Sequence, residues 1–137
     1  MNEAIREVLG EAGAPPLPEP LAGFIVDSHT HLDTVQDVVG IEPAISLAAA
    51  REVGVTRIAQ IGCDIAGSEF AEELARTHKN VIAAVAIHPN DAARLGRKKI
   101  GDALKRIDEL ANVGNHVRAI GETGIDHFGT TDADGQA

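Results

Sequence analysis

His29 and His31, separated by a single threonine, are the residues whose type and spacing most clearly indicate chemistry. Residues i and i+2 of an extended segment point to the same side, so these two imidazoles can hold one divalent metal ion. Aspartates flank the pair at positions 27 and 33, and a carboxylate beside a ligating histidine can fix its tautomer. An arbitrary HxH is more often two surface histidines in a loop. The position at the carboxyl end of a predicted parallel strand, where α/β active sites lie, favours the metal.

Glu122 is the second candidate, in the segment AIGETGID between Gly121 and Gly124. It directly follows another predicted strand, and a carboxylate at that point can complete or bridge a metal site with oxygen ligands. Taken alone, it would be an ordinary loop glutamate. Two predicted strand ends that both carry residues of ligand type favour a shared metal site.

His88, in the segment Ile87-His88-Pro89, also follows a predicted strand directly. Its imidazole can ligate a metal, orient a substrate phosphate or donate a proton, whereas a capping or core histidine is the equally weighted alternative. Asp126 can support the loop of Glu122 or a metal-bound water. The single cysteine, Cys63, follows a further predicted strand, and we expect a buried and inert thiol there.

The candidate residues are positioned by short apolar runs that predict β-strands. The third of these runs is apolar without alternation, which is typical of a parallel strand covered on both faces. The four predicted strands are residues 24–26, 55–62, 81–87 and 117–121.

Helical patterns separate the predicted strands. Pro43 is expected in the first turn of one helix, and Ser68 is expected to cap a second. Apolar residues at helical spacing between Ile100 and Ala111 indicate a third. The alternation of strand and helix argues for a parallel sheet with helical crossovers. Two architectures fit it: an open doubly wound sheet, or an eight-stranded α/β barrel of which this chain supplies about half.

A short amphipathic helix and a proline-rich connector precede this alternation. Proline removes backbone donors and fixes φ, so the connector is expected to be extended. The predicted organisation is therefore residues 1–22 as an N-terminal helix with its connector, and residues 23–137 as one domain of alternating strands and helices.

Composition and charge argue against several classes of protein. The 137 residues include one cysteine, no run long enough to span a membrane and an acidic N-terminus, which together predict a cytoplasmic protein. Twelve basic residues against 21 acidic ones give a net charge of −9, so a broad basic surface for nucleic acid is not expected. Neither a phosphate-binding glycine loop nor a GxSxG nucleophile motif occurs, so the sequence does not support nucleotide-cofactor binding or a serine-nucleophile hydrolase.

Three segments, VDSHTHLD, AIHPND and AIGETGIDHF, resemble the TatD family of metal-dependent hydrolases in their order and in their places at strand ends. The resemblance runs from Phe24 to the C-terminus and covers the first half of the family's domain. It implies a (β/α)8 TIM-barrel type metallohydrolase of which the chain forms roughly the first four βα units. It also implies one or two divalent metal ions (Zn, Mg or Mn), a metal-activated water as nucleophile, and DNA as the substrate of a deoxyribonuclease.

Carried over residue by residue, the resemblance assigns the family's first pair of metal ligands to His29 and His31 and its bridging glutamate to Glu122. It assigns catalytic positions to His88, although Ala86 stands where glycine is usual, and to Asp126. The family draws two further histidines and a catalytic aspartate from later strands, and this chain ends after the predicted fourth strand.

Two alternatives remain open at this point. One is a related amidohydrolase-type enzyme that cleaves C–N bonds, which a lysine after the fourth strand would favour, although Glu122 stands there. The other is a catalytically incomplete half barrel that persists through self-association or with a partner, because its edge strands and apolar surface are left uncovered.

Overall fold

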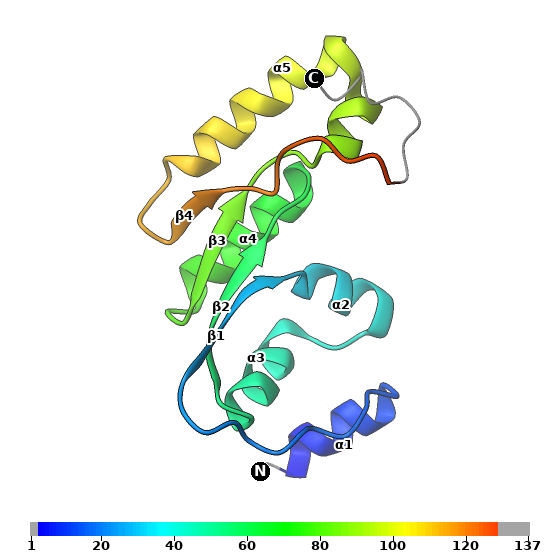
Figure 1. The fold of residues 1–137 in the computed structure, drawn as a ribbon, viewed down its shortest axis with the longest axis vertical. Helices are drawn as coiled ribbons and strands as arrows, with labels where there is room; N and C mark the ends of the chain where they lie inside the picture. The colour runs from blue at the N-terminus through cyan, green and yellow to red at the C-terminus, as the bar shows by residue number, and fades with distance from the viewer. Residues whose placement is uncertain (1–2, 129–137) are drawn as a thin grey trace. The chain divides into compact units, whose positions relative to one another are not determined.

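The computed structural model describes residues 3–128, which divide into two compact units, one up to Ile58 and one from Ala59 onward. Four strands form one sheet in chain order, β1-β2-β3-β4. Chain order is expected for successive βα units, and the predicted parallel α/β class is confirmed. The strands are β1 (Ile25–Thr30), β2 (Val55–Ile61), β3 (Val81–Val85) and β4 (Val117–Ile120), as labelled in Figure 1.

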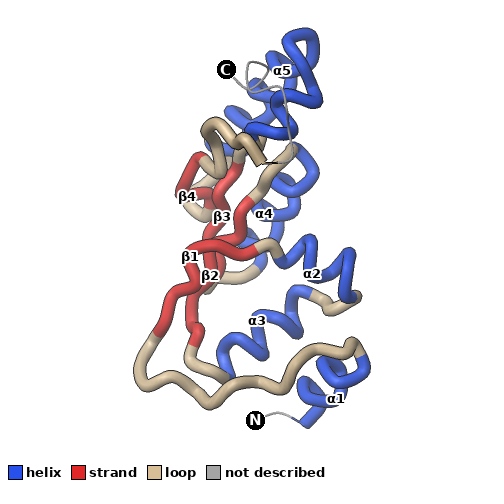
Figure 2. The backbone as a smooth tube through the Cα atoms, turned by 45° about the vertical axis from the view of Figure 1, so that its right-hand side comes forward, coloured by secondary structure: helices blue, strands red, loops and turns tan. Residues whose placement is uncertain are grey.

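The first unit contains β1, the beginning of β2 and three short helices, α1 (Glu3–Glu11), α2 (Leu32–Val39) and α3 (Pro43–Glu52). Proline opens α3, as predicted. The connector between α1 and β1 is a long loop in Figure 2 and carries the chain to β1, where the Ile25 amide donates to the Gly54 carbonyl at 3.0 Å. A small apolar cluster holds the helices together: Ile5, Leu9, Ile41 and Ala49.

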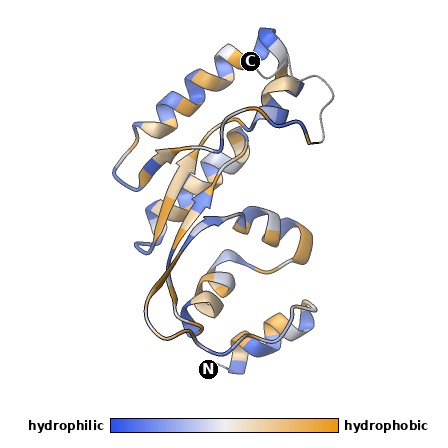
Figure 3. Cartoon of the chain, in the orientation of Figure 1, coloured by the Kyte–Doolittle hydropathy of each residue, from blue (hydrophilic) through white to orange (hydrophobic). Residues whose placement is uncertain are grey.

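The second unit contains the end of β2, then α4 (Ile65–Thr77), β3, α5 (Pro89–Ala111) and β4. β3 and β4 pair in parallel, and α4 and α5 contact each other and β3. Figure 3 shows β3 coloured toward the hydrophobic end of the scale, whereas polar and apolar residues alternate along α5. A core cluster lies between β3 and α5: Val85, Ile87, Ala103, Ile107 and Leu110.

Helix α4 begins earlier than predicted, and Ser68 is not its cap. Asp64 caps the helix instead, because its carboxylate accepts a hydrogen bond from the Gly67 amide at 2.7 Å. Ser68 is fully buried, and its hydroxyl bonds both the amide and the carbonyl of Ala86 at 3.1 Å. Gly62 makes this approach feasible, since a Cβ there would lie 2.5 Å from the Ser68 Cα.

Helix α5 also begins earlier than the apolar pattern between residues 100 and 111 predicts. It starts at Pro89 and is kinked at Gly96, whose φ of 65° and ψ of 172° interrupt the helical geometry. The kink separates an N-terminal piece, which follows His88, from the long amphipathic piece that packs on β3. The basic residues 97–99 follow this kink.

Within residues 3–128, no helix combines the length and the apolar character needed to cross a membrane. The end of the predicted barrel segment, residues 129–137, lies outside the described part of the chain. The boundary between residues 22 and 23 stays a prediction.

Candidate active site

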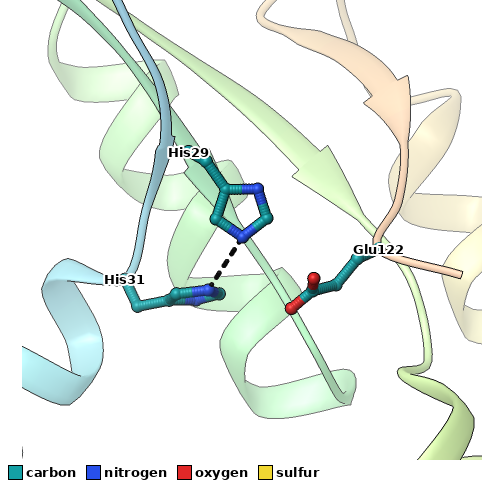
Figure 4. A group of neighbouring side chains, drawn as sticks. All are labelled: His29, His31 and Glu122. Atoms are coloured by element: carbon teal, nitrogen blue, oxygen red, sulfur yellow. Dashed lines mark hydrogen bonds between the residues drawn. The ribbon is translucent and has the colours of Figure 1, made fainter. Parts of the chain in front are cut away.

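The two histidines of the HxH segment lie side by side in the first unit (Figure 4). Their Nε2 atoms are 3.1 Å apart, and the rings meet edge to face with centroids 5.0 Å apart. Two imidazole nitrogens on one tetrahedral zinc ion, each about 2.05 Å from it, lie about 3.3 Å apart. The observed separation is close to that value, so the pair fits a single cation with little movement.

The local chain geometry explains why both rings face the same side. His29 lies in β1, and its amide donates to the Asp27 carboxylate at 3.1 Å. His31 is the cap residue of α2, and its carbonyl accepts from the Val35 amide at 3.1 Å. Leu32 is buried and anchors the first turn of α2. The expectation that the i and i+2 imidazoles lie together is therefore confirmed, whereas Asp27 contacts the backbone of His29.

Glu122, also drawn in Figure 4, belongs to the second unit and directly follows β4. The preceding amide, that of Gly121, donates to the Val85 carbonyl at 3.3 Å and holds the end of β4 beside β3. The half-buried Glu122 carboxylate contacts Cys63, with Sγ and Oε1 3.3 Å apart. The expectation of a buried cysteine is wrong, because Cys63 is partly exposed and faces this carboxylate.

His88 caps α5 and at the same time presents a ring nitrogen. Its Nδ1 accepts a hydrogen bond from the Asn90 amide at 3.2 Å, so the neutral ring carries its proton on Nε2. That Nε2 lies 3.8 Å from the Asp126 carboxylate. The His88 amide donates to the Cys63 carbonyl at 2.6 Å. The capping alternative for His88 is thus confirmed. The Nε2–H, on the side of the Asp126 carboxylate, takes no part in the cap.

Asn90 is a residue whose role at this edge the sequence did not indicate. Its side-chain amide donates to the Asp126 carboxylate at 2.9 Å and to the Phe128 carbonyl at 3.0 Å. The Phe128 amide in turn donates to Asp126 at 2.7 Å. These contacts fasten the loop after β4 to the start of α5. The contacts of Asn90 join residues that are 36 and 38 positions apart. In the sequence, only the presence of these residues in the segments AIHPND and AIGETGIDHF could have suggested such contacts.

A cavity of about 400 Å³ opens where α4 and α5 begin, at the carboxyl ends of β2 and β3. Its lining combines apolar and charged residues. The lining residues are Asp64, Ile65, Ala66, Ile87, Asp91, Arg94, Leu95 and Lys99.

An ion pair connects α5 to α4 farther along the two helices. Arg106 of α5 donates to the Glu69 carboxylate of α4 at 2.9 Å and to Glu109 at 3.1 Å. The hydrogen bond to Glu69, followed by that to Glu109, raises the pKa of the Arg106 guanidinium. Because these groups are exposed, their contribution is to orient the helices rather than to stabilise them strongly.

Comparison with known proteins decides the family. A family model described as TatD related DNase matches residues 26–136. The chain belongs to the TatD family. An uncharacterised metal-dependent hydrolase TatD from Mycobacterium tuberculosis is 35% identical over 117 residues, which is 82% of this chain and 41% of the relative. The crystal structure of YJJV, a TatD homologue from Escherichia coli K12, superposes with a TM-score of 0.62 at 26% identity.

The superposition covers 80% of this chain and 40% of YJJV. The chain therefore spans about two fifths of the length of the TatD relatives that it matches. The fold is the parallel α/β fold of a TatD-type TIM barrel, of which the chain covers part. This finding decides between the two architectures in favour of the barrel.

Proposed function

We propose that this chain is part of a divalent-metal-dependent hydrolase of phosphodiester bonds, with DNA as its substrate. The observation that carries the proposal is the 3.1 Å separation of the His29 and His31 Nε2 atoms at the end of β1. Family membership supports it, since the model that matches is that of TatD related DNases.

We assign the metal ligands to His29, His31 and Glu122. Two imidazoles and a carboxylate are a donor set that suits zinc and accepts manganese, and each of the three residues lies at the carboxyl end of a strand. Carboxyl ends of parallel strands open on one side of a barrel, which is where such enzymes hold their ligands. When bound, a divalent ion supplies a Lewis acid that polarises a phosphoryl oxygen and activates water.

His88 is proposed to act on the substrate phosphate, and Asp126 to support it. The His88 ring is held in place by the Asn90 amide, which bonds Nδ1, so its Nε2–H can donate to a phosphoryl oxygen without reorganising. Asp126 has both carboxylate oxygens engaged, by Asn90 and by Phe128, which makes it an orienting group for the His88 ring and its loop.

The cavity between the starts of α4 and α5 is proposed to receive a part of the substrate next to the scissile bond. Its volume of about 400 Å³ is within the range of small-ligand sites. The cations Arg94 and Lys99 in its lining are balanced by Asp64 and Asp91, and Arg94 pairs with Asp91, so the cavity offers polar contacts rather than a net positive charge.

The test is hydrolysis of a DNA oligonucleotide carrying a fluorophore and a quencher, with Mg²⁺, Mn²⁺ or Zn²⁺ and with EDTA. We expect cleavage that requires the metal and is lost in the His29→Ala/His31→Ala double variant. His78→Ala, which removes a histidine at the end of α4, is the matched control and should cleave normally. Cleavage that persists in EDTA or in the double variant would contradict the proposal.

A second candidate is a catalytically incomplete half barrel that binds metal but requires a second chain. The exposed apolar residues of the outer strands favour it, since Val26 in β1 is 59% exposed and Ile120 in β4 is 61% exposed. Uncovered apolar strands promote association. Size-exclusion chromatography separates the candidates: a dimer that binds metal without hydrolysis supports the incomplete barrel, and an active monomer refutes it.

A further inference from the structure

We infer that Cys63 is a positioning residue that holds the Glu122 carboxylate in the orientation needed for metal binding. The inference rests on the proposed function, because it takes Glu122 as a ligand. It goes beyond that function by assigning a role to Cys63, the single cysteine in the sequence.

The backbone on either side of the thiol is fixed by neighbouring strands. The Gly62 amide donates to the Ala84 carbonyl at 2.9 Å, and the Cys63 carbonyl accepts from the His88 amide at 2.6 Å. Gly62 is also pressed against Ser68, so this segment has little freedom to shift. Cys63 is thereby tied to the end of β3 through its backbone, and its side chain is left to reach the end of β4.

The thiol meets Glu122 in a geometry suited to a hydrogen bond. Sγ lies 3.3 Å from Oε1, and a thiol is a donor whereas an ionised carboxylate only accepts. One such bond uses one of about four acceptor positions on the carboxylate. A long side chain that is ordered before the metal arrives loses less entropy when it binds.

The surroundings of Cys63 argue against a purely space-filling role. A packing cysteine is normally fully buried among apolar side chains, whereas Cys63 is partly exposed and contacts a carboxylate. The same residue also bonds His88 through its carbonyl. It therefore touches two of the residues assigned to the site, as groups that orient metal ligands do.

The first measurement is the affinity of the whole chain for Mn²⁺ and Zn²⁺, by calorimetry, in the wild type, Cys63→Ser and Cys63→Ala. Serine keeps a donor at this position and alanine removes it. Loss of a group that orients a ligand lowers metal affinity by about 10- to 100-fold, and a thiol is a weak donor, so we expect about tenfold for alanine. The serine variant should bind close to the wild type.

The second measurement needs no metal. Because the chain has one cysteine, its Raman spectrum contains a single S–H stretching band, and the frequency of that band reports hydrogen bonding of the thiol. We expect Glu122→Ala to move the band toward the frequency of a free thiol. His78→Ala, far from Cys63 in the chain and at the other end of α4, should leave it unchanged.

The outcomes separate the inference from the proposed function. A wild-type chain that binds no metal overturns the proposed function, while the S–H band still decides whether the thiol holds Glu122. Alanine and wild-type chains of equal affinity overturn the inference alone. A serine variant as weak as alanine also overturns it, because a hydrogen-bond donor at this position would then not support metal binding. Thermal unfolding of each metal-free variant checks that folding is intact.

Discussion

Replacing Gly96 with alanine is expected to destabilise the second unit, because the kink in α5 depends on a backbone conformation that side chains disfavour. Gly96 has φ 65° and ψ 172°, a combination that is almost confined to glycine. A Cβ at this position would have no atom within 4 Å, so the cost is one of backbone conformation and not of steric overlap. Holding alanine in that region costs about 1–3 kcal/mol.

Gly101 in the same helix provides a matched control. It is exposed and helical, and a Cβ there would also have no atom within 4 Å. Alanine in an exposed helix interior is more stable than glycine by about 0.5–1 kcal/mol, so Gly101→Ala should stabilise the chain. The two substitutions are chemically identical, but they should change the free energy of unfolding in opposite directions. Their effects should therefore differ by about 1.5–4 kcal/mol.

Urea unfolding followed by circular dichroism measures both changes. Thermal unfolding provides a second measurement. A free-energy change of 1 kcal/mol corresponds to a shift of about 4–8 °C in the melting temperature of a unit of this size, which is easily resolved. Stabilisation by both substitutions would show that α5 is a continuous helix in solution. The kink at Gly96 would then not set the position of the His88 end of α5.

Further substitutions test the packing and the loop attachment. Ser68→Ala should cost about 1–3 kcal/mol in urea unfolding, because a buried amide and a buried carbonyl lose their hydroxyl partner. Ile107→Ala should cost about 2–5 kcal/mol, whereas Leu104→Ala on the exposed side of α5 should change stability by less than about 0.5 kcal/mol; equal effects would refute the assigned helix face. Asn90→Ala should speed hydrogen exchange of the Phe128 amide, and unchanged exchange would argue against the loop attachment.

The strand pattern was predictable because it depends on local composition. The run VIAAV forms β3, and the apolar segments around it form strands within a few residues of the predicted bounds. β1 is longer than its apolar run, because the polar residues up to Thr30 continue the extended chain. Helix α2 was not predicted, since its eight residues bury only Leu32 and include several β-branched side chains.

The errors at Ser68 and Cys63 have a common cause. Both residues interact with groups that are distant in sequence: Ser68 with Ala86, and Cys63 with Glu122. A serine near a helix start and a cysteine after a strand suggest local roles, and only the packing of α4 against β3 and of β4 beside β3 shows otherwise.

The candidate histidines were predictable for a different reason. An i, i+2 pair at the end of a strand is brought together by backbone geometry alone, so their 3.1 Å separation follows from local structure. The loop attachment through Asn90 depends on contacts that span more than thirty residues and carries no local signal.

The most direct test of the central claim, that His29, His31 and Glu122 bind one divalent ion together, is calorimetric titration of Mn²⁺ into the whole chain and its variants. The account predicts that His29→Ala, His31→Ala and Glu122→Gln each weaken binding by more than about tenfold, since each removes a ligand, while His78→Ala binds as the wild type does. Undiminished binding by Glu122→Gln, or by either histidine variant, would contradict it.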